Sequence, residues 1–173
     1  PRLDMTVKLP DEFWTNASGD TVDNMFPSLT GGFLMEKYVN LDIAPFNQQS
    51  ALETDQDMIH LRYADILLMY AEAKNEATGP DASVYNALNE VRQRTGVEMP
   101  DVDQSRYNTR ESLRQFIRNE RRVELALEGH RYFDLKRWRI AHEVLPALLT
   151  PNGDPLVFEQ KNYYLPFTTE ELD

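Results

Sequence analysis

The sequence predicts a mainly α-helical fold of stacked helical hairpins with loop-rich, partly extended flanks. Long runs of helix-forming residues fill positions 58–145 and stop at glycine or proline, which commonly end helices. On either side, prolines, glycines and asparagines alternate with short apolar pieces, as in irregular segments. We expect an irregular part with a short strand over residues 1–57, helical hairpins over 58–145 and an extended part over 146–173.

The length and charge of the chain limit the kinds of protein to which it can belong. Its 173 residues are enough for one domain with a core. A net charge of −11 argues against nucleic-acid binding, because a phosphate-binding face needs a basic excess. No apolar run approaches the ~20 residues of a membrane span. Cysteines are absent, the three histidines are scattered and no phosphate or dinucleotide motif occurs, so we expect no metal and no cofactor.

The first helix is expected over residues 58–77, ahead of the stop signal Gly79-Pro80. At about 100° per residue its charged side chains share one narrow stripe, and apolar side chains fill most of the remaining circumference. The stripe holds Arg62, Asp65, Glu72 and Glu76. Such a helix is buried almost all round. We therefore expect it to need more neighbours than the other helices of this chain supply.

The second helix is expected to pair with the first. It should begin from Asp81 or Ser83 as the N-cap and end at Gly96, whose missing Cβ suits a left-handed conformation. Because only a short loop separates the two helices, we expect an antiparallel hairpin. The short strand of the N-terminal part is expected within "GGFLMEKYV", residues 31–39.

Two further helices should follow a polar linker. The third is expected from a capping-box-like start at Asn108 and Glu111 to Glu128, with Gly129 as its stop. The fourth is expected over residues 131–145, directly before a proline. These two helices would form a second hairpin stacked on the first.

The third helix carries charged residues on its apolar face. The helical period places Glu120 and Glu124 near the middle of the apolar stripe, so both carboxylates should point inward. A buried carboxylate needs a cation or several donors, since leaving it unpaired costs several kcal/mol. We expect the partners to be backbone N–H groups or arginines, with Arg62, Arg131 and Arg137 as candidates, and the pairs to hold the hairpins in register.

Other functions remain open from the residues alone. Glu120 and Glu124 could be the two carboxylates of a glycoside hydrolase, but such a pair lies at the floor of an open cleft rather than on a packing face. A helical-repeat adaptor is a third possibility. Phe13 and Trp14, in the irregular part, are weak candidates for stacking on a sugar ring. Otherwise the ligand-binding residues are unknown.

Several segments resemble, in order, the C-terminal half of the SusD/RagB family. They are "LRYADILLMYAEAKNEA", "ALNEVRQRTGV", "ESLRQFIRNERRVELALEGHRYFDLKRW" and "YYLPFTTEEL", and the earlier pieces "PRLDMTV" and "GGFLMEKYV" also look like that family. The residues that match the family signature are Glu120, Glu124, Glu128, Gly129, Arg131, Asp134, Leu135, Arg137 and Trp138. The family's usual "PIP" near the end reads Leu165-Pro166-Phe167 here.

The resemblance implies a non-catalytic nutrient-binding lipoprotein, usually a glycan binder, on the outer surface of the outer membrane of Bacteroidetes-type bacteria. Such proteins cap a SusC-like TonB-dependent transporter and hand it oligosaccharide; a peptide or protein ligand is the alternative within the family. Their fold packs tetratricopeptide-like helix pairs against an irregular ligand-binding part. On this reading the signature residues are scaffold, the chain is one C-terminal piece of a larger domain, and the lipid anchor lies in an N-terminal part outside it.

Overall fold

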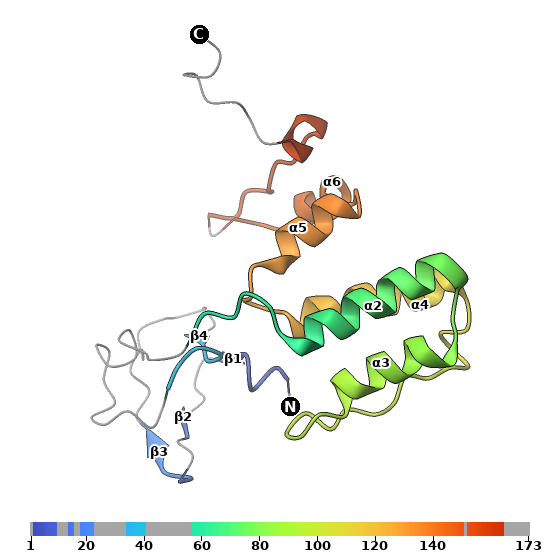
Figure 1. The fold of residues 1–173 in the computed structure, drawn as a ribbon. Helices are drawn as coiled ribbons and strands as arrows, with labels where there is room; N and C mark the ends of the chain where they lie inside the picture. The colour runs from blue at the N-terminus through green and yellow to red at the C-terminus, as the bar shows by residue number, and fades with distance from the viewer. Residues whose placement is uncertain are drawn as a thin grey trace. The chain divides into compact units, whose positions relative to one another are not determined.

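The structure is a computed structural model that describes residues 2–9, 14–15, 18–22, 34–40, 57–150 and 152–164. The chain divides into two compact units, Pro1–Leu127 and Glu128–Asp173, which we call the first and second units. The described residues are mainly helical and their strands have two residues each (Figure 1). The predicted fold class is therefore confirmed.

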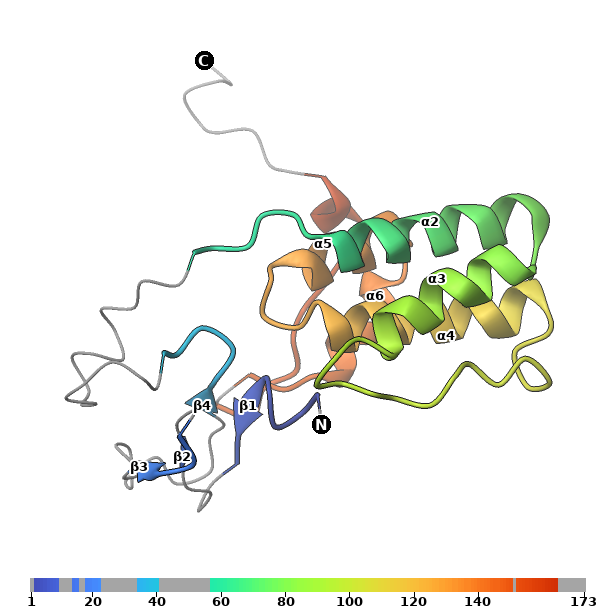
Figure 2. The same ribbon diagram turned by 60° about the horizontal axis from the view of Figure 1, so that its bottom comes forward.

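Three helices form the body of the first unit: α2 (Tyr63–Thr78), α3 (Ala82–Arg92) and α4 (Arg110–Glu124). Helix α2 packs against both α3 and α4, and Figure 2 shows α2 and α3 running antiparallel as a hairpin. The core between them is apolar. Its fully buried members include Leu68, Val84, Leu88, Leu113 and Ile117.

Helix α2 begins five residues later than expected, at Tyr63 rather than Met58. The preceding residue, Arg62, is extended, with φ −142° and ψ 163°, and its guanidinium contacts Glu124 on α4. Since that contact belongs to tertiary structure, the helix-forming character of residues 58–62 does not decide their conformation.

Helix α3 begins after Asp81, one of the two expected N-caps. The Asp81 carboxylate accepts hydrogen bonds from the backbone N–H groups of Ser83 (2.8 Å) and Val84 (3.2 Å) and from the Ser83 hydroxyl (2.6 Å). These donors lower the pKa of Asp81 to about 2, with the Ser83 hydroxyl as the largest cause. The charged carboxylate is therefore the form that caps the helix.

This cap makes the stability of the first unit depend on acid pH. Because the folded pKa of Asp81 is depressed from 3.8 to about 2, its stabilisation is present above pH 3.8 and is lost as pH falls through about 2. We expect urea midpoints of the unsubstituted protein and of Asp81→Asn to differ by a constant amount from pH 7 to 5. The difference should shrink between pH 4 and 3, and a difference that stays unchanged there would contradict this assignment.

The predicted start and end of the third helix are both wrong. Helix α4 is capped by Thr109 instead of Asn108, and Ser112 instead of Glu111 completes the capping box. Its last residue is Glu124, not Glu128, because Leu127 adopts a left-handed conformation with φ 65° before Gly129 is reached. A non-glycine residue in this region cannot continue a right-handed helix.

The capping box at the start of α4 contributes to the stability of the protein. The Thr109 hydroxyl accepts a hydrogen bond from the Ser112 N–H, and the Ser112 hydroxyl accepts one from the Thr109 N–H, both 3.1 Å. We expect Thr109→Ala to lower the free energy of unfolding by about 1 kcal/mol, because it leaves a terminal N–H without its acceptor. Thr109→Ser keeps the hydroxyl and serves as the control in urea unfolding. Equal losses in both variants would mean that the cap is not the cause.

Short strands lie in the N-terminal part of the first unit. Strand β1 (Val7–Lys8) pairs antiparallel with β4 (Leu34–Met35), and β2 (Trp14–Thr15) pairs antiparallel with β3 (Thr21–Val22). Strand β4 falls within the expected residues 31–39. The pairing of β1 with β4 brings the first residues of the chain beside residues 34–40, and both segments contribute to the site described below.

The second unit contains α5 (His130–Arg137), α6 (Ala141–Val144) and two 3-10 turns, Leu145–Ala147 and Gln160–Tyr163. One continuous helix over residues 131–145 was expected, and this is wrong. Arg139, with φ 58°, interrupts the helix between α5 and α6. No helix among the described residues is both long and apolar enough to cross a membrane.

Candidate functional site

Two carboxylates of α4 lie in the interior of the first unit. Glu120 and Glu124 are one helical turn apart, and each is only 3% exposed. They continue the line of Leu113 and Ile117, which are buried on the same face. A helix presents residues three and four apart on one face, so the spacing that buries the leucine and isoleucine also buries the glutamates.

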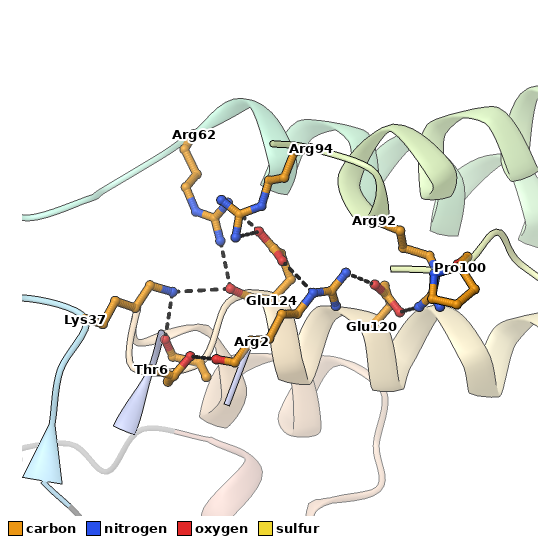
Figure 3. A network of polar contacts seen from close by, with 10 residues as sticks. Arg2, Thr6, Lys37, Arg62, Arg92, Arg94, Pro100, Glu120 and Glu124 are labelled. Carbon is orange, nitrogen blue, oxygen red and sulfur yellow. Dashed lines mark hydrogen bonds and ion pairs between the residues drawn. The ribbon is translucent and has the colours of Figure 1, made fainter. Parts of the chain in front are cut away.

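Glu120 is held between two arginines from distant parts of the chain. Arg2 Nη2 lies 2.5 Å from its Oε1, and Arg92 Nη1 lies 2.8 Å from its Oε2. Arg92 also donates through Nε to the backbone carbonyl of Pro100 at 2.7 Å. Both carboxylate oxygens therefore face a guanidinium (Figure 3).

Glu124 is contacted by three arginines. Arg62 Nη1 lies 2.8 Å and Arg94 Nη2 3.2 Å from its Oε1, and Arg2 Nε lies 3.4 Å from its Oε2. Figure 3 shows the Arg2 guanidinium between the two glutamates, with Arg62 and Arg94 on the other side of Glu124. Arg2 thus bridges both carboxylates. We call Arg2, Arg62, Arg92, Arg94, Glu120 and Glu124 the arginine–glutamate network.

The C-terminal end of α4 is satisfied by cations as well. Arg62 Nη2 donates to the backbone carbonyl of Glu124 at 2.7 Å, and Lys37 Nζ donates to the carbonyls of Glu124 (3.2 Å) and Ala126 (3.0 Å). The last carbonyls of a helix lack partners within the helix and carry its negative dipole end. Cationic side chains from residues 37 and 62 therefore stabilise this end by both hydrogen bonding and charge.

A second buried pair joins α2 to α4. Arg121 Nη1 donates to Asp65 Oδ1 at 2.8 Å, and both side chains are almost fully buried. Arg121 Nε also lies 3.9 Å from Glu72 Oε2. The charged stripe of α2 thus faces the interior in part. The expectation that this helix is buried almost all round is wrong for the described residues, because its apolar residues at 63, 66, 69 and 70 are 41% to 64% exposed.

This geometry favours a structural role for the two glutamates over hydrolysis. A glycoside hydrolase needs one carboxyl group as a proton donor and a second as a base or nucleophile, with room between them for the scissile bond. Here each carboxylate is nearly inaccessible and is bonded to guanidinium groups. Among the described residues there is also no group of histidine, aspartate or glutamate side chains that could hold a metal ion.

The remaining signature residues belong to the second unit. Arg137 Nε donates to Asp134 Oδ1 at 2.8 Å, and the Arg137 guanidinium lies 4.8 Å from the ring centroid of Trp138. Leu135 is buried in the small core of this unit. Gly129 has φ 81° directly before α5; Glu128 and Arg131 are half-buried.

The side chains of the two aromatic residues considered for stacking on a sugar ring, Phe13 and Trp14, are not described by the structure. Phe13 lies outside the described residues, and Trp14 is described only through its backbone in β2. The helical pattern of the sequence does not predict Arg2, Lys37, Arg92 and Arg94 as partners of α4. All four stand in segments that resemble the family, "PRLDMTV", "GGFLMEKYV" and "ALNEVRQRTGV", and this was the available signal.

Three hollows lined by described residues adjoin the network. One has a volume of about 660 Å³ and is lined by residues at the start of α2 and the end of α3, among them Tyr63, Leu67, Glu90 and Arg94. The side-chain hydrogen bond with Glu90 raises the pKa of Tyr63. A second, about 260 Å³, is lined by charged residues of the network together with Thr6, Lys37 and neighbouring apolar residues. A third, about 270 Å³, is lined by residues that include Arg2, Arg92 and Glu120.

Comparison with known proteins matches residues 4–171 to the SusD family. SusD-like protein P25 of Formosa agariphila is 35% identical over 147 residues, which make up 80% of this chain and 25% of that protein. SusD-like protein P2 of the same organism is 32% identical over 126 residues, or 69% of this chain and 24% of that protein.

Solved structures agree with this match. A SusD-like carbohydrate binding protein of Bacteroides fragilis is 27% identical and superposes with a TM-score of 0.76 over 99% of this chain and 40% of its own. A second SusD-like protein of that organism is 33% identical, with a TM-score of 0.61 over 83% of this chain and 28% of its own. The chain thus spans about a quarter of the length of the curated relatives. It belongs to the SusD family.

Proposed function

We propose that this chain is the C-terminal scaffold of a non-catalytic binding subunit that captures oligosaccharide at the cell surface and passes it to a SusC-like TonB-dependent transporter. The observation that carries the proposal is family membership over residues 4–171, together with the likeness of 99% of the chain to a carbohydrate binding protein. Because the chain spans about a quarter of its curated relatives, the proposal assigns the ligand surface mainly to other parts of the protein.

The scaffold role rests on the arginine–glutamate network. It ties residues from three places in the sequence, around positions 2, 62 and 93, to a single helix, α4. Buried ion pairs of this kind contribute little net stability, yet losing one partner is costly. The network therefore fixes which segments lie beside α4, and so holds the irregular N-terminal part and the α2–α3 hairpin in one arrangement.

The proposed location is the outer face of the outer membrane, through a lipid anchor outside residues 1–173. The test is the intact mass of the native polypeptide recovered from the host's membrane fraction. We expect a species several times heavier than 20.1 kDa that carries lipid and co-purifies with a large β-barrel transporter. A soluble, unlipidated species of 20.1 kDa would contradict both the location and the transporter partnership.

The ligand class needs a separate experiment on the same native protein. We expect calorimetry with a panel of soluble plant, algal and host polysaccharides to give binding to at least one, without release of shorter products over days. Product release would contradict the absence of catalysis. Binding to peptides but to no member of the glycan panel would move the assignment to the peptide-binding alternative.

A further inference from the structure

Arg139 separates α5 from α6 in the second unit and has an exposed side chain. Its backbone is left-handed, with φ 58°. This conformation is uncommon for a residue with a side chain and recurs at binding sites. Glu98 and Leu127 adopt it too, so the backbone alone does not mark a site. The contacts of the Arg139 side chain are the second observation.

The Arg139 guanidinium lies against two tyrosine rings. Its Cζ is 4.7 Å from the ring centroid of Tyr163 and 5.6 Å from that of Tyr164, and both distances are within the about 6 Å of a cation–π contact. Tyr163 is 9% exposed, whereas Tyr164 is 68% exposed. The guanidinium is therefore held by a buried ring, while the second ring that it contacts stays open to solvent.

Tyr163 is itself anchored in the core of the second unit. Its hydroxyl lies 2.6 Å from His142 Nδ1 and accepts a hydrogen bond from the His142 N–H at 3.3 Å. Its ring meets that of Phe158 edge-on, with the centroids 4.9 Å apart. A side chain that is already positioned loses less conformational freedom when a ligand binds. Arg139, resting on this ring, presents its N–H donors in a preorganised position.

Arg139 forms no ion pair with any residue that the structure describes. Two exposed carboxylates of the same unit lie beside other cations: Glu143 is 3.8 Å from His142, and Glu159 is 2.7 Å from Lys161. An arginine offers five N–H donors in a planar fork whose geometry matches a carboxylate. The positive charge and the donors of Arg139 are therefore available to an anionic group from outside the chain.

We propose that Arg139 and Tyr164 form a subsite for an acidic sugar residue of the bound oligosaccharide. The carboxylate of a uronic acid binds the Arg139 guanidinium through two parallel hydrogen bonds, and the sugar ring packs against the exposed Tyr164 ring, which offers an apolar face. This inference rests on the proposed function, from which it takes a saccharide as the ligand. It adds the acidic class of the sugar and a contact within residues 1–173.

The charge of the whole chain opposes an acidic ligand at long range. The net charge is −11, but exposed charges farther apart than about 8 Å are largely screened at physiological salt. Binding of an acidic sugar therefore depends on a local cation that no carboxylate of the chain already occupies. Arg139 meets this condition.

The experiment measures binding by calorimetry to the native, full polypeptide that contains residues 1–173. The probes are oligosaccharides of galacturonate, glucuronate and mannuronate, each compared with its methyl ester, which keeps the sugar rings and removes the charge. We expect at least one acidic oligosaccharide to bind more tightly than its ester. Arg139→Gln should weaken that binding by at least about tenfold, as expected when a charged hydrogen-bond donor is lost. Tyr164→Ala should weaken it by about threefold to tenfold through loss of the ring contact.

Arg106→Gln is the matched control. Arg106 is also an exposed arginine that stacks on a tyrosine, with its Cζ 5.2 Å from the ring centroid of Tyr107, but it belongs to the first unit. This substitution should leave the affinity unchanged. Equal affinities for acid and ester, or equal losses of affinity in Arg139→Gln and Arg106→Gln, would overturn the proposal.

Arg139→Gly separates binding from a structural role. Glycine suits the left-handed backbone, so this variant should lose the binding without a lower Tm. A lower Tm with unchanged affinity would show that Arg139 acts only in the structure, and would also overturn the proposal. Binding of neutral glycans alone would overturn the acidic subsite and leave the proposed function standing, whereas binding of no glycan at all would contradict both.

Discussion

Replacing Glu124 with alanine is expected to lower the free energy of unfolding by about 3–5 kcal/mol, the cost of removing one partner from a buried ionic pair. The substitution would leave Arg2, Arg62 and Arg94 facing one another without the anion that all three contact. Glu124→Gln keeps an oxygen acceptor and should cost less, about 1–3 kcal/mol. Urea unfolding with a fixed slope measures both changes.

Glu111 supplies the matched control on the same helix. Its side chain is 76% exposed and lies 3.7 Å from Arg114, an exposed pair of the kind that contributes at most about 1 kcal/mol. Glu111→Ala and Glu111→Gln should therefore each change the free energy of unfolding by no more than about 0.5 kcal/mol. If Glu124→Ala destabilised the protein no more than Glu111→Ala, the buried network would not be what holds α4 in place.

A second large loss of stability is expected when the ion pair between Asp65 of α2 and Arg121 of α4 is broken. Arg121→Met should lower the free energy of unfolding by about 3–5 kcal/mol, because the Asp65 carboxylate, 4% exposed, loses the guanidinium that donates to it at 2.8 Å. Methionine fills much of the space of the arginine stem, so the loss reports the charge more than the volume.

A double-mutant cycle separates the pair from its surroundings. Asp65→Leu combined with Arg121→Met removes both charges and should be clearly more stable than Arg121→Met alone, since two apolar side chains of similar size replace a buried ion pair at little cost. Additive losses in the double variant would show that Asp65 and Arg121 are not coupled, and that other contacts of Arg121 explain its effect.

The regular helices could be predicted because their signals are local. Runs of helix formers, the Asp81 cap and the stop at Gly79 predict α2 and α3, but α2 begins five residues later than expected and α3 ends at Arg92, short of the predicted stop at Gly96. The ends of α4 were predicted wrongly because neighbouring residues are about equally suited to cap or to end the helix. Asn108 and Thr109 are both good caps, and Leu127 turns left-handed two residues before the glycine that suggested a stop.

The orientation of α2 could not be predicted from its own sequence. Its apolar residues occupy most of the circumference, so no single face is favoured by periodicity. Asp65 is inside because Arg121, 56 positions later, lies opposite it. A pairing over that distance is decided by tertiary packing, and the helical pattern of residues 63–78 contains no information about it.

The sequence predicts the two buried glutamates of the candidate site, but it does not predict most of their cationic partners. The helical period places Glu120 and Glu124 on the apolar face, and the rule that buried charges are paired requires cations near them. It does not say which of the 18 lysines and arginines they are. Arg62 was among the candidates and contacts Glu124. Arg2 and Arg92 contact Glu120 because the folded chain brings distant segments together, and local sequence patterns do not predict that arrangement.

The central claim is that Glu124 acts through structure and takes no part in ligand chemistry. The most direct measurement replaces Glu124 by glutamine in the host's own gene. The proposed function places the protein at the cell surface and gives it a glycan ligand, so both the amount of folded protein there and growth on candidate polysaccharides are then recorded. We expect the two to fall in proportion. Full surface abundance with growth lost would contradict the claim, because it would place Glu124 in ligand binding or catalysis.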